Sequence, residues 1–220
     1  MQRDLFDASH NEKIKLNDGA YLLKAYALPF EATLMKSLMA ITTDAPFRHM
    51  LTPGGRKMSV AMSNCGSGGW ITDKKGYRYD HLDPLTEKAW PAMPSDFFSL
   101  AQKAAEEAGF SDFSPNSCLI NCYEPGAKMA LHQDKDEGDF SHPIVSISLG
   151  LTAKFLFGGL SRKDKAKRVL LSHGDVVVWG GVSRLAYHGI DKLKDGVHEV
   201  TGPFRYNLTF RSAQTIDHLG

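Results

Sequence analysis

The segment RYNLTFR, residues 205–211, decides the fold because apolar and polar side chains alternate along it without a break. A period of two is typical of a β-strand whose faces meet different surroundings. One face carries Tyr206, Leu208 and Phe210, and the other carries Arg205, Asn207, Thr209 and Arg211. Two arginines on an inward face would need carboxylate partners, which a dicarboxylate ligand can supply. The alternative is an edge strand with a solvated polar face.

Shorter apolar runs precede this strand between turn residues, at 118–123, 144–149, 154–157, 169–171 and 176–179. Regularly spaced short strands favour an antiparallel sandwich or barrel. Nearer the N-terminus, a short strand is expected at 20–25, and apolar residues recur at helical spacing from Pro29 to Ile41. A second helix is expected at 95–108. The predicted fold is therefore mainly β (α+β), with the helices buttressing one face.

The 220-residue chain is predicted to form a single domain, 1–220, because 42% hydrophobic residues suffice for a core. Residues 1–19 are polar and lack periodicity, so we expect a flexible arm. Residues 46–94 are rich in glycine, proline and aromatic residues, which is typical of short hairpins and loops. Residues 115–214 hold the β-rich core. The net charge of +1 does not by itself indicate a polyanionic partner.

The cysteines and the hydropathy of the chain indicate the cellular compartment. Cys65, Cys118 and Cys122 are odd in number and form no CxxC pair, which argues against a disulfide framework or a structural zinc site. The first residues, MQRDLFDASHNEKIKL, contain no apolar segment, and no stretch approaches the length of a membrane span. We expect a cytoplasmic protein that neither enters a membrane nor is exported.

The tripeptide HQD at 132–134 offers two metal ligands, because residues i and i+2 of a strand project from one face. A second match, HLD at 81–83, is interpreted as an accident of composition. His188 supplies a third ligand directly before the last strand. Together, His132, Asp134 and His188 match the facial triad of non-haem Fe(II) oxygenases. Ordinary core or surface histidines are the alternative, and a zinc hydrolase would use the same ligands.

These elements together resemble the AlkB family of Fe(II)- and 2-oxoglutarate-dependent dioxygenases. The resemblance covers residue 20 onward and rests on Asn121-Cys122-Tyr123, His132-Gln133-Asp134-Lys135-Asp136, Gly180-Gly181…His188-Gly189, 205–211, 52–55 and 58–62. It implies a double-stranded β-helix, or jelly roll, in which 46–94 form a nucleotide-recognition lid. It also implies that O2 is consumed, that Fe(II) is held by the catalytic residues His132, Asp134 and His188, and that 2-oxoglutarate is held by Asn121, Tyr123, Arg205, Asn207 and Arg211.

The resemblance further implies direct-reversal repair: oxidative demethylation of N-alkylated bases such as 1-methyladenine and 3-methylcytosine. Single-stranded DNA is the preferred substrate, with RNA and double-stranded DNA as further substrates. These bases are cationic, so an aromatic face and a carboxylate would favour them. The implied substrate contacts are Trp70, Tyr77, Arg78, Tyr79, Asp136 and Arg162. The alternative for Trp70 is that it pins its loop to the core. The alternative for the basic run 162–168 is a solvated hairpin turn.

Three competing functions remain open at this point. The same oxygenase chemistry could act on a protein or a small molecule, which formaldehyde release from methylated oligonucleotides would distinguish. A non-catalytic jelly-roll binding module would not need Arg205 and Arg211 inside its barrel. A zinc hydrolase would need no dicarboxylate cosubstrate. In each case we expect a monomer.

Overall fold

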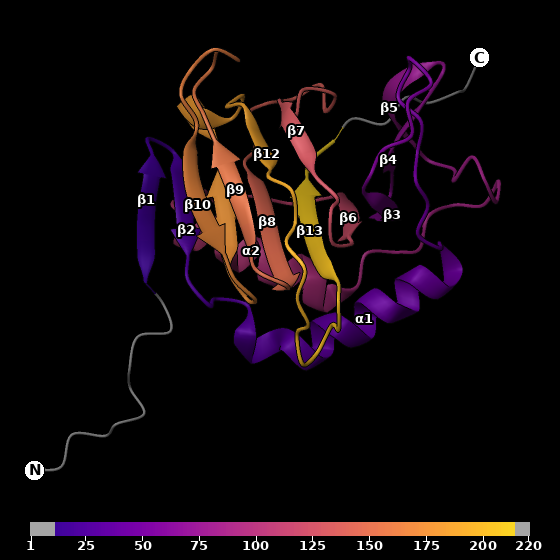
Figure 1. Cartoon of the computed structure of the whole chain (residues 1–220), viewed down its shortest axis with the longest axis horizontal. Helices are drawn as coiled ribbons and strands as arrows, with labels where there is room; N and C mark the ends of the chain where they lie inside the picture. Colours follow the sequence, from indigo (N-terminus) through magenta and orange to yellow (C-terminus); the bar gives the residue numbers. More distant parts are fainter. Residues whose placement is uncertain (1–11, 214–220) are drawn as a thin grey trace, which may run out of the picture.

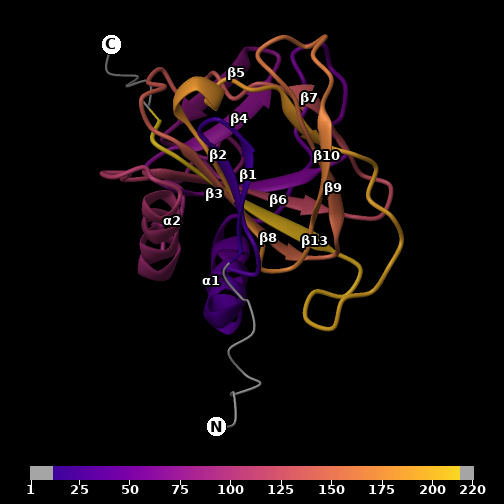
Figure 2. The same ribbon diagram turned by 90° about the vertical axis from the view of Figure 1, so that its left-hand side faces the viewer.

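The computed structural model describes residues 12–213, which form two antiparallel sheets, two long helices and a separate hairpin (Figures 1 and 2). The larger sheet has the order β1-β2-β11-β8-β13-β6-β3. Its strands are Lys13–Asn17, Ala20–Leu23, Val176–Trp179, Ile144–Gly150, Arg205–Arg211, Ser117–Tyr123 and Ala61–Gly66, given in that order. The smaller sheet, β10-β9-β12-β7, comprises Lys167–Leu171, Ala153–Phe157, His188–Ile190 and Met129–His132.

The two sheets form one sandwich. Leu119 and Trp179 from the larger sheet and Phe155 and Phe157 from the smaller one belong to a single buried apolar cluster. This arrangement of antiparallel strands is the jelly roll that we predicted.

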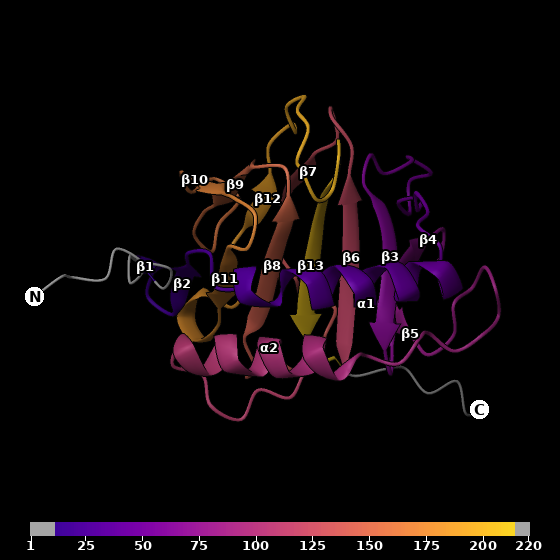
Figure 3. The ribbon, with the colours of Figure 1, turned by 90° about the horizontal axis from the view of Figure 1, so that it is seen from below.

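Two helices cover the outer face of the larger sheet (Figure 3). Helix α1, Glu31–Asp44, follows the short 3-10 turn η1, Leu28–Phe30, and helix α2 is Ser95–Glu107. Their buried side chains join those of the sheet in a second apolar cluster, where Phe97 meets Phe210 edge-on at 5.8 Å between ring centroids. The predicted buttressing helices are thus confirmed.

Strand β13 lies at the centre of the larger sheet, between β8 and β6. All seven of its residues are buried. Its apolar face packs under the helices, whereas Arg205, Asn207, Thr209 and Arg211 line a cavity between the sheets. The edge-strand alternative is therefore wrong, and this strand brings two guanidinium groups into the barrel.

The lid segment contains the hairpin of β4, Gly69–Asp73, and β5, Gly76–Asp80, which pair only with each other (Figure 1). An isolated bridge between Leu51 and Lys57 marks a second, smaller turn. Residues 46–94 thus form short hairpins and loops only in part: Ala61–Gly66 are β3 of the larger sheet, so the predicted lid includes a core strand, and the predicted core at 115–214 lacks β1, β2 and β3.

The flexible arm predicted for residues 1–19 is wrong in part. Residues 1–11 lie outside the described residues, but Lys13–Asn17 form β1 and pair with β2. Leu16 is buried there, because Ile14 and Leu16 alternate with lysines and give this edge strand an apolar face. No helix within residues 12–213 is long and apolar enough to cross a membrane.

Gly150→Ala should destabilise the protein by about 2 to 4 kcal/mol, because the backbone is left-handed here and the end of β8 is crowded. Gly150 has φ +89°, and an added Cβ would lie 2.2 Å from Thr201 Oγ1. Gly109 is a matched control, since its φ is +91° but nothing lies within 4 Å of the added Cβ. Urea unfolding should show a loss of only about 1 kcal/mol for Gly109→Ala. Equal losses would contradict the crowding argument.

Candidate metal centre and active site

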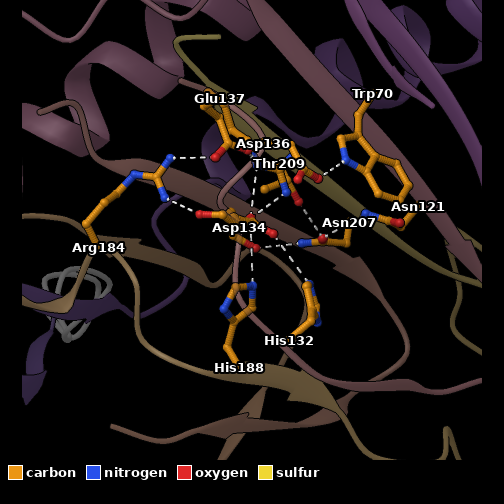
Figure 4. A network of polar contacts seen from close by, with 12 residues as sticks. Trp70, Asn121, His132, Asp134, Asp136, Glu137, Arg184, His188, Asn207 and Thr209 are labelled. Atoms are coloured by element: carbon orange, nitrogen blue, oxygen red, sulfur yellow. Dashed lines mark hydrogen bonds and ion pairs between the residues drawn. The ribbon is translucent and has the colours of Figure 1, made fainter. Parts of the chain in front are cut away.

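Three side chains that can ligate a metal converge between the sheets: one ligand atom from each of His132, Asp134 and His188 lies within 4.8 Å of the others. His132 ends β7, His188 begins β12, and the two are direct partners across these strands. Both imidazoles point at the Asp134 carboxylate (Figure 4). Asp134 itself lies in the loop after β7, so the prediction of one continuous HxD strand is wrong although the convergence is as expected.

The hydrogen bonds of the two imidazoles orient their free nitrogens. Nδ1 of His132 lies 2.9 Å from the Ala130 carbonyl oxygen, and Nδ1 of His188 lies 3.0 Å from that of Ala186. A carbonyl only accepts, so each Nδ1 carries a proton and Nε2 is the ring nitrogen that faces Asp134. These Nε2 atoms lie 3.5 and 3.7 Å from the Asp134 carboxylate oxygens. Two imidazole Nε2 atoms and a carboxylate are therefore aimed at one point.

The charges around the triad hold Asp134 and His188 in the forms that a metal requires. At His132, burial acts to lower the pKa, but the Asp134 carboxylate outweighs it and raises that pKa. Burial acts to raise the pKa of Asp134, but the positive charge of Arg211 and the two histidines outweigh it and hold that pKa well below its usual range. Burial, reinforced by His132, lowers the pKa of His188 to about 4. At neutral pH Asp134 is ionised and His188 is neutral.

A small cavity of about 50 Å³ adjoins the triad and is lined by the five predicted cosubstrate residues: Asn121, Tyr123, Arg205, Asn207 and Arg211. Arg205 is 1% exposed, and its Nη2 donates to Ser148 Oγ at 3.0 Å. Its Nε and Nη1 have no hydrogen-bond partner among the described residues. A buried cation without a carboxylate is costly, so this position fits an anionic ligand.

The second arginine differs from this expectation. Nε and Nη2 of Arg211 donate to Asp134 Oδ2 at 3.0 and 2.6 Å, so its carboxylate partner comes from the chain itself. Burial acts to lower the pKa of Arg211, but Asp134 outweighs it and the pKa is raised. For Arg205, burial dominates and the pKa is lowered. The arginine that lacks a carboxylate partner is therefore Arg205, and Arg211 first of all orients Asp134.

A buried ion-pair network behind the triad escaped the sequence analysis. Glu137 accepts hydrogen bonds from Arg184 Nη2 at 3.1 Å and from the Tyr79 hydroxyl at 2.9 Å. Arg184 also donates through Nη1 to the Asp134 carbonyl oxygen at 2.8 Å (Figure 4). Glu137 and Arg184 thus fix the loop that carries Asp134. Glu137 closely follows the HQD tripeptide, which is the signal that could have drawn attention to it.

A larger cavity of about 620 Å³ opens beside the triad, lined by His132, Asp134 and four of the predicted substrate residues: Trp70, Tyr77, Asp136 and Arg162. Trp70 stacks on Tyr77 at 5.7 Å, and its Nε1 donates to Asp136 Oδ2 at 2.8 Å. The Arg162 guanidinium lies 5.2 Å from the Tyr187 ring. An aromatic face, a carboxylate and a cation therefore surround the approach to the metal ligands.

Two predicted substrate residues do not line this cavity. Arg78 faces the other side of its hairpin and forms a double hydrogen bond with Asp73 at 3.0 and 2.9 Å. Tyr79 is buried against Glu137. Strand alternation explains this for Arg78, which lies between Tyr77 and Tyr79 in β5 and points away from both, whereas Tyr79 shares the face of Tyr77 but is buried against Glu137. Neither side chain contacts a ligand in this cavity directly.

Comparison with known proteins agrees with this site. The family described as the 2OG-Fe(II) oxygenase superfamily matches residues 19–211. Alpha-ketoglutarate-dependent dioxygenase AlkB of Escherichia coli (strain K12) is 55% identical over 96% of this chain and 97% of its own length. DNA N(6)-methyladenine demethylase ALKBH1C of Arabidopsis thaliana is 33% identical over 63% of this chain and 36% of its own. The solved structure of OsALKBH1, 29% identical, has a TM-score of 0.80 and covers 91% of this chain and 99% of that one.

The chain therefore belongs to the 2OG-Fe(II) oxygenase superfamily and, within it, to the AlkB dioxygenases. Its cofactors are Fe(II) and 2-oxoglutarate. The converging imidazoles and carboxylate suit Fe(II), and the unpartnered guanidinium of Arg205 suits a dicarboxylate.

Arg184→Ala should lower the free energy of unfolding of the metal-free protein by about 3 kcal/mol, because the buried Glu137 carboxylate loses its hydrogen-bonded guanidinium and keeps the longer contact to Arg211 Nε at 3.4 Å. Arg78→Ala is the matched control: its partner Asp73 is 41% exposed, so less than about 1 kcal/mol should be lost. Urea unfolding of both variants measures the difference. Equal losses would show that Arg184 does not stabilise the Asp134 loop in this way.

Proposed function

We propose that this dioxygenase demethylates N-alkylated bases in nucleic acid. The observation that carries the proposal is the pairing of two cavities at one triad: a small one with an unpartnered guanidinium and a larger one with stacked aromatic rings and a carboxylate. The first suits 2-oxoglutarate, and the second suits a flat, positively charged base. The names of the related proteins support a nucleic-acid substrate.

The residues divide the work of binding. His132, Asp134 and His188 would hold Fe(II) through two Nε2 atoms and a carboxylate oxygen, and Arg205 would bind a carboxylate of 2-oxoglutarate. Asn121 and Tyr123 line the same cavity, and the Asn207 amide donates to Ser146 Oγ at 2.8 Å, which fixes its orientation. When bound, the two cofactors supply the oxidation: O2 and 2-oxoglutarate give succinate and carbon dioxide, and the N-methyl group is hydroxylated and lost as formaldehyde.

Base selection falls to the larger cavity. Trp70, held by Tyr77 on one side and Asp136 at its edge, offers an aromatic face to a base. 1-Methyladenine and 3-methylcytosine are cationic, so the ring face and the Asp136 carboxylate favour them over unmodified bases. His132 lines the same cavity, which brings the methyl group of such a base towards the metal ligands.

Strand selection follows from access. A base must leave its stack to enter the cavity, and this costs least in a single strand. Lys128, Lys135 and Arg162 line the cavity mouth and can contact phosphates. Single-stranded DNA is therefore the preferred substrate, with RNA and double-stranded DNA as further substrates. A monomeric enzyme and a cytoplasmic location stay predictions from the sequence.

The direct test is mass spectrometry of single-stranded DNA oligonucleotides that carry 1-methyladenine or 3-methylcytosine, incubated with the protein, Fe(II), ascorbate, 2-oxoglutarate and O2. We expect loss of the methyl group with about one succinate and one formaldehyde per base restored. Omission of 2-oxoglutarate and replacement of Fe(II) by Zn²⁺ are the controls, and both should abolish the reaction. Succinate formation without demethylation of any oligonucleotide would favour a protein or small-molecule substrate instead.

A further inference from the structure

The hairpin that presents Trp70 has an anchor at its open end. The last cross-strand pair of β4 and β5 is Gly69 with Asp80. Trp90, which is 5% exposed, contacts both residues: its Nε1 donates to the Asp80 carbonyl oxygen at 3.0 Å, and an added Cβ on Gly69 would lie 2.4 Å from its ring. Trp70 follows Gly69 directly. One indole therefore joins both strands next to the residue that we assign to base stacking.

Trp90 is in turn tied to the larger sheet. The Arg48 guanidinium lies 5.0 Å from the Trp90 ring centroid, and its Nη1 lies 2.5 Å from Asp83 Oδ1. Asp83 is 1% exposed and also accepts the amide of Leu85 at 2.8 Å. The backbone of Arg48 exchanges hydrogen bonds of 3.0 and 2.8 Å with Met62 in β3. A continuous set of contacts thus runs from the sheet to the hairpin base.

The hairpin needs such external support. β4 and β5 pair only with each other, and an isolated two-stranded hairpin is at best marginally stable in water. Asn64 of β3 holds the Trp70 backbone from the side of the sheet, with bonds of 3.0 and 3.1 Å. Trp90 contacts the hairpin at its open end, where Gly69 pairs with Asp80. Together they leave the hairpin little freedom to turn about its base.

We propose that Trp90, held by Arg48 and Asp83, is a positioning residue that sets the place of Trp70 and through it the affinity for alkylated nucleic acid. The inference rests on the proposed function. In the part of the chain that the structure describes, Arg48, Asp83 and Trp90 do not line the larger cavity, so they act on the substrate through the hairpin. A displaced Trp70 would stack less well on the base both before and during the reaction, so the affinity for substrate falls while kcat is kept.

Two variants test the contact from opposite sides. Trp90→Leu removes the indole, and Gly69→Ala leaves Trp90 intact but adds a methyl group where its ring lies. Each should raise the KM for a 3-methylcytosine oligonucleotide about tenfold, while kcat and the substrate-independent turnover of 2-oxoglutarate stay within about twofold of wild type. Trp90→Phe keeps an aromatic ring and loses only the hydrogen bond to Asp80. Its KM should therefore lie between that of wild type and that of Trp90→Leu.

Leu38→Ala is the matched control, because Leu38 is fully buried in α1 and remote from the hairpin in sequence and in layer. It should destabilise the fold by a cavity effect without raising the KM. Hydrogen exchange supplies a readout without substrate: residues 69–80 should exchange faster in Trp90→Leu than in wild type, and at the wild-type rate in Leu38→Ala.

The outcomes separate this inference from the proposed function. Wild-type protein that fails to demethylate the oligonucleotide would overturn the proposed function and the substrate part of the inference together, and hydrogen exchange would still decide whether Trp90 anchors the hairpin. Active wild-type protein with an unchanged KM in both Trp90→Leu and Gly69→Ala would overturn the inference alone. Equal rises in KM for Trp90→Leu and Leu38→Ala would also overturn it, because they would reflect general destabilisation.

Discussion

The contact on which the site depends is the buried ion pair of Arg211 with Asp134. Arg211 comes from β13 in the larger sheet, and Asp134 follows β7 of the smaller sheet, so the pair joins the two halves of the sandwich. Burying the Arg211 guanidinium carries a desolvation cost, which the Asp134 carboxylate offsets through two hydrogen bonds. The pair thereby fixes one metal ligand, and the imidazoles of His132 and His188 reach it from neighbouring strands.

The two arginines of β13 differ in whether a carboxylate of the chain compensates their charge. Arg211 is neutralised within the chain by Asp134, with Glu137 3.4 Å away, whereas Arg205 donates to the Ser148 hydroxyl and lies over the Tyr123 ring, with no carboxylate partner among the described residues. The free energy cost of burying Arg205 is offset only when an anion enters the small cavity. We propose that this uncompensated positive charge beside the metal ligands is what binds 2-oxoglutarate.

Much of this could be predicted from sequence because the informative residues lie in regular strands. The alternation along 205–211 predicts both the buried position of β13 and its inward arginines. The spacing of His132 and His188 along the chain does not show that they are cross-strand partners in β7 and β12. Arg184 could not be predicted, because a charged residue in a loop leaves no periodic signal, and for Glu137 the one signal was its place just after the HQD tripeptide. The family resemblance places Arg78 in the substrate site, although strand alternation turns its side chain away from the larger cavity. β1 was missed because lysines mask Ile14 and Leu16.

The central claim is that the triad and Arg205 together hold Fe(II) and 2-oxoglutarate. Anaerobic titration of the Fe(II)-loaded protein with 2-oxoglutarate, followed by the visible charge-transfer absorption of the chelate, tests it most directly. We expect saturation at about one 2-oxoglutarate per chain, and in Arg205→Ala a requirement raised by about a hundredfold, as for loss of a buried charged hydrogen bond. Unchanged titration in Arg205→Ala, or no absorption with the wild-type protein, would contradict the account.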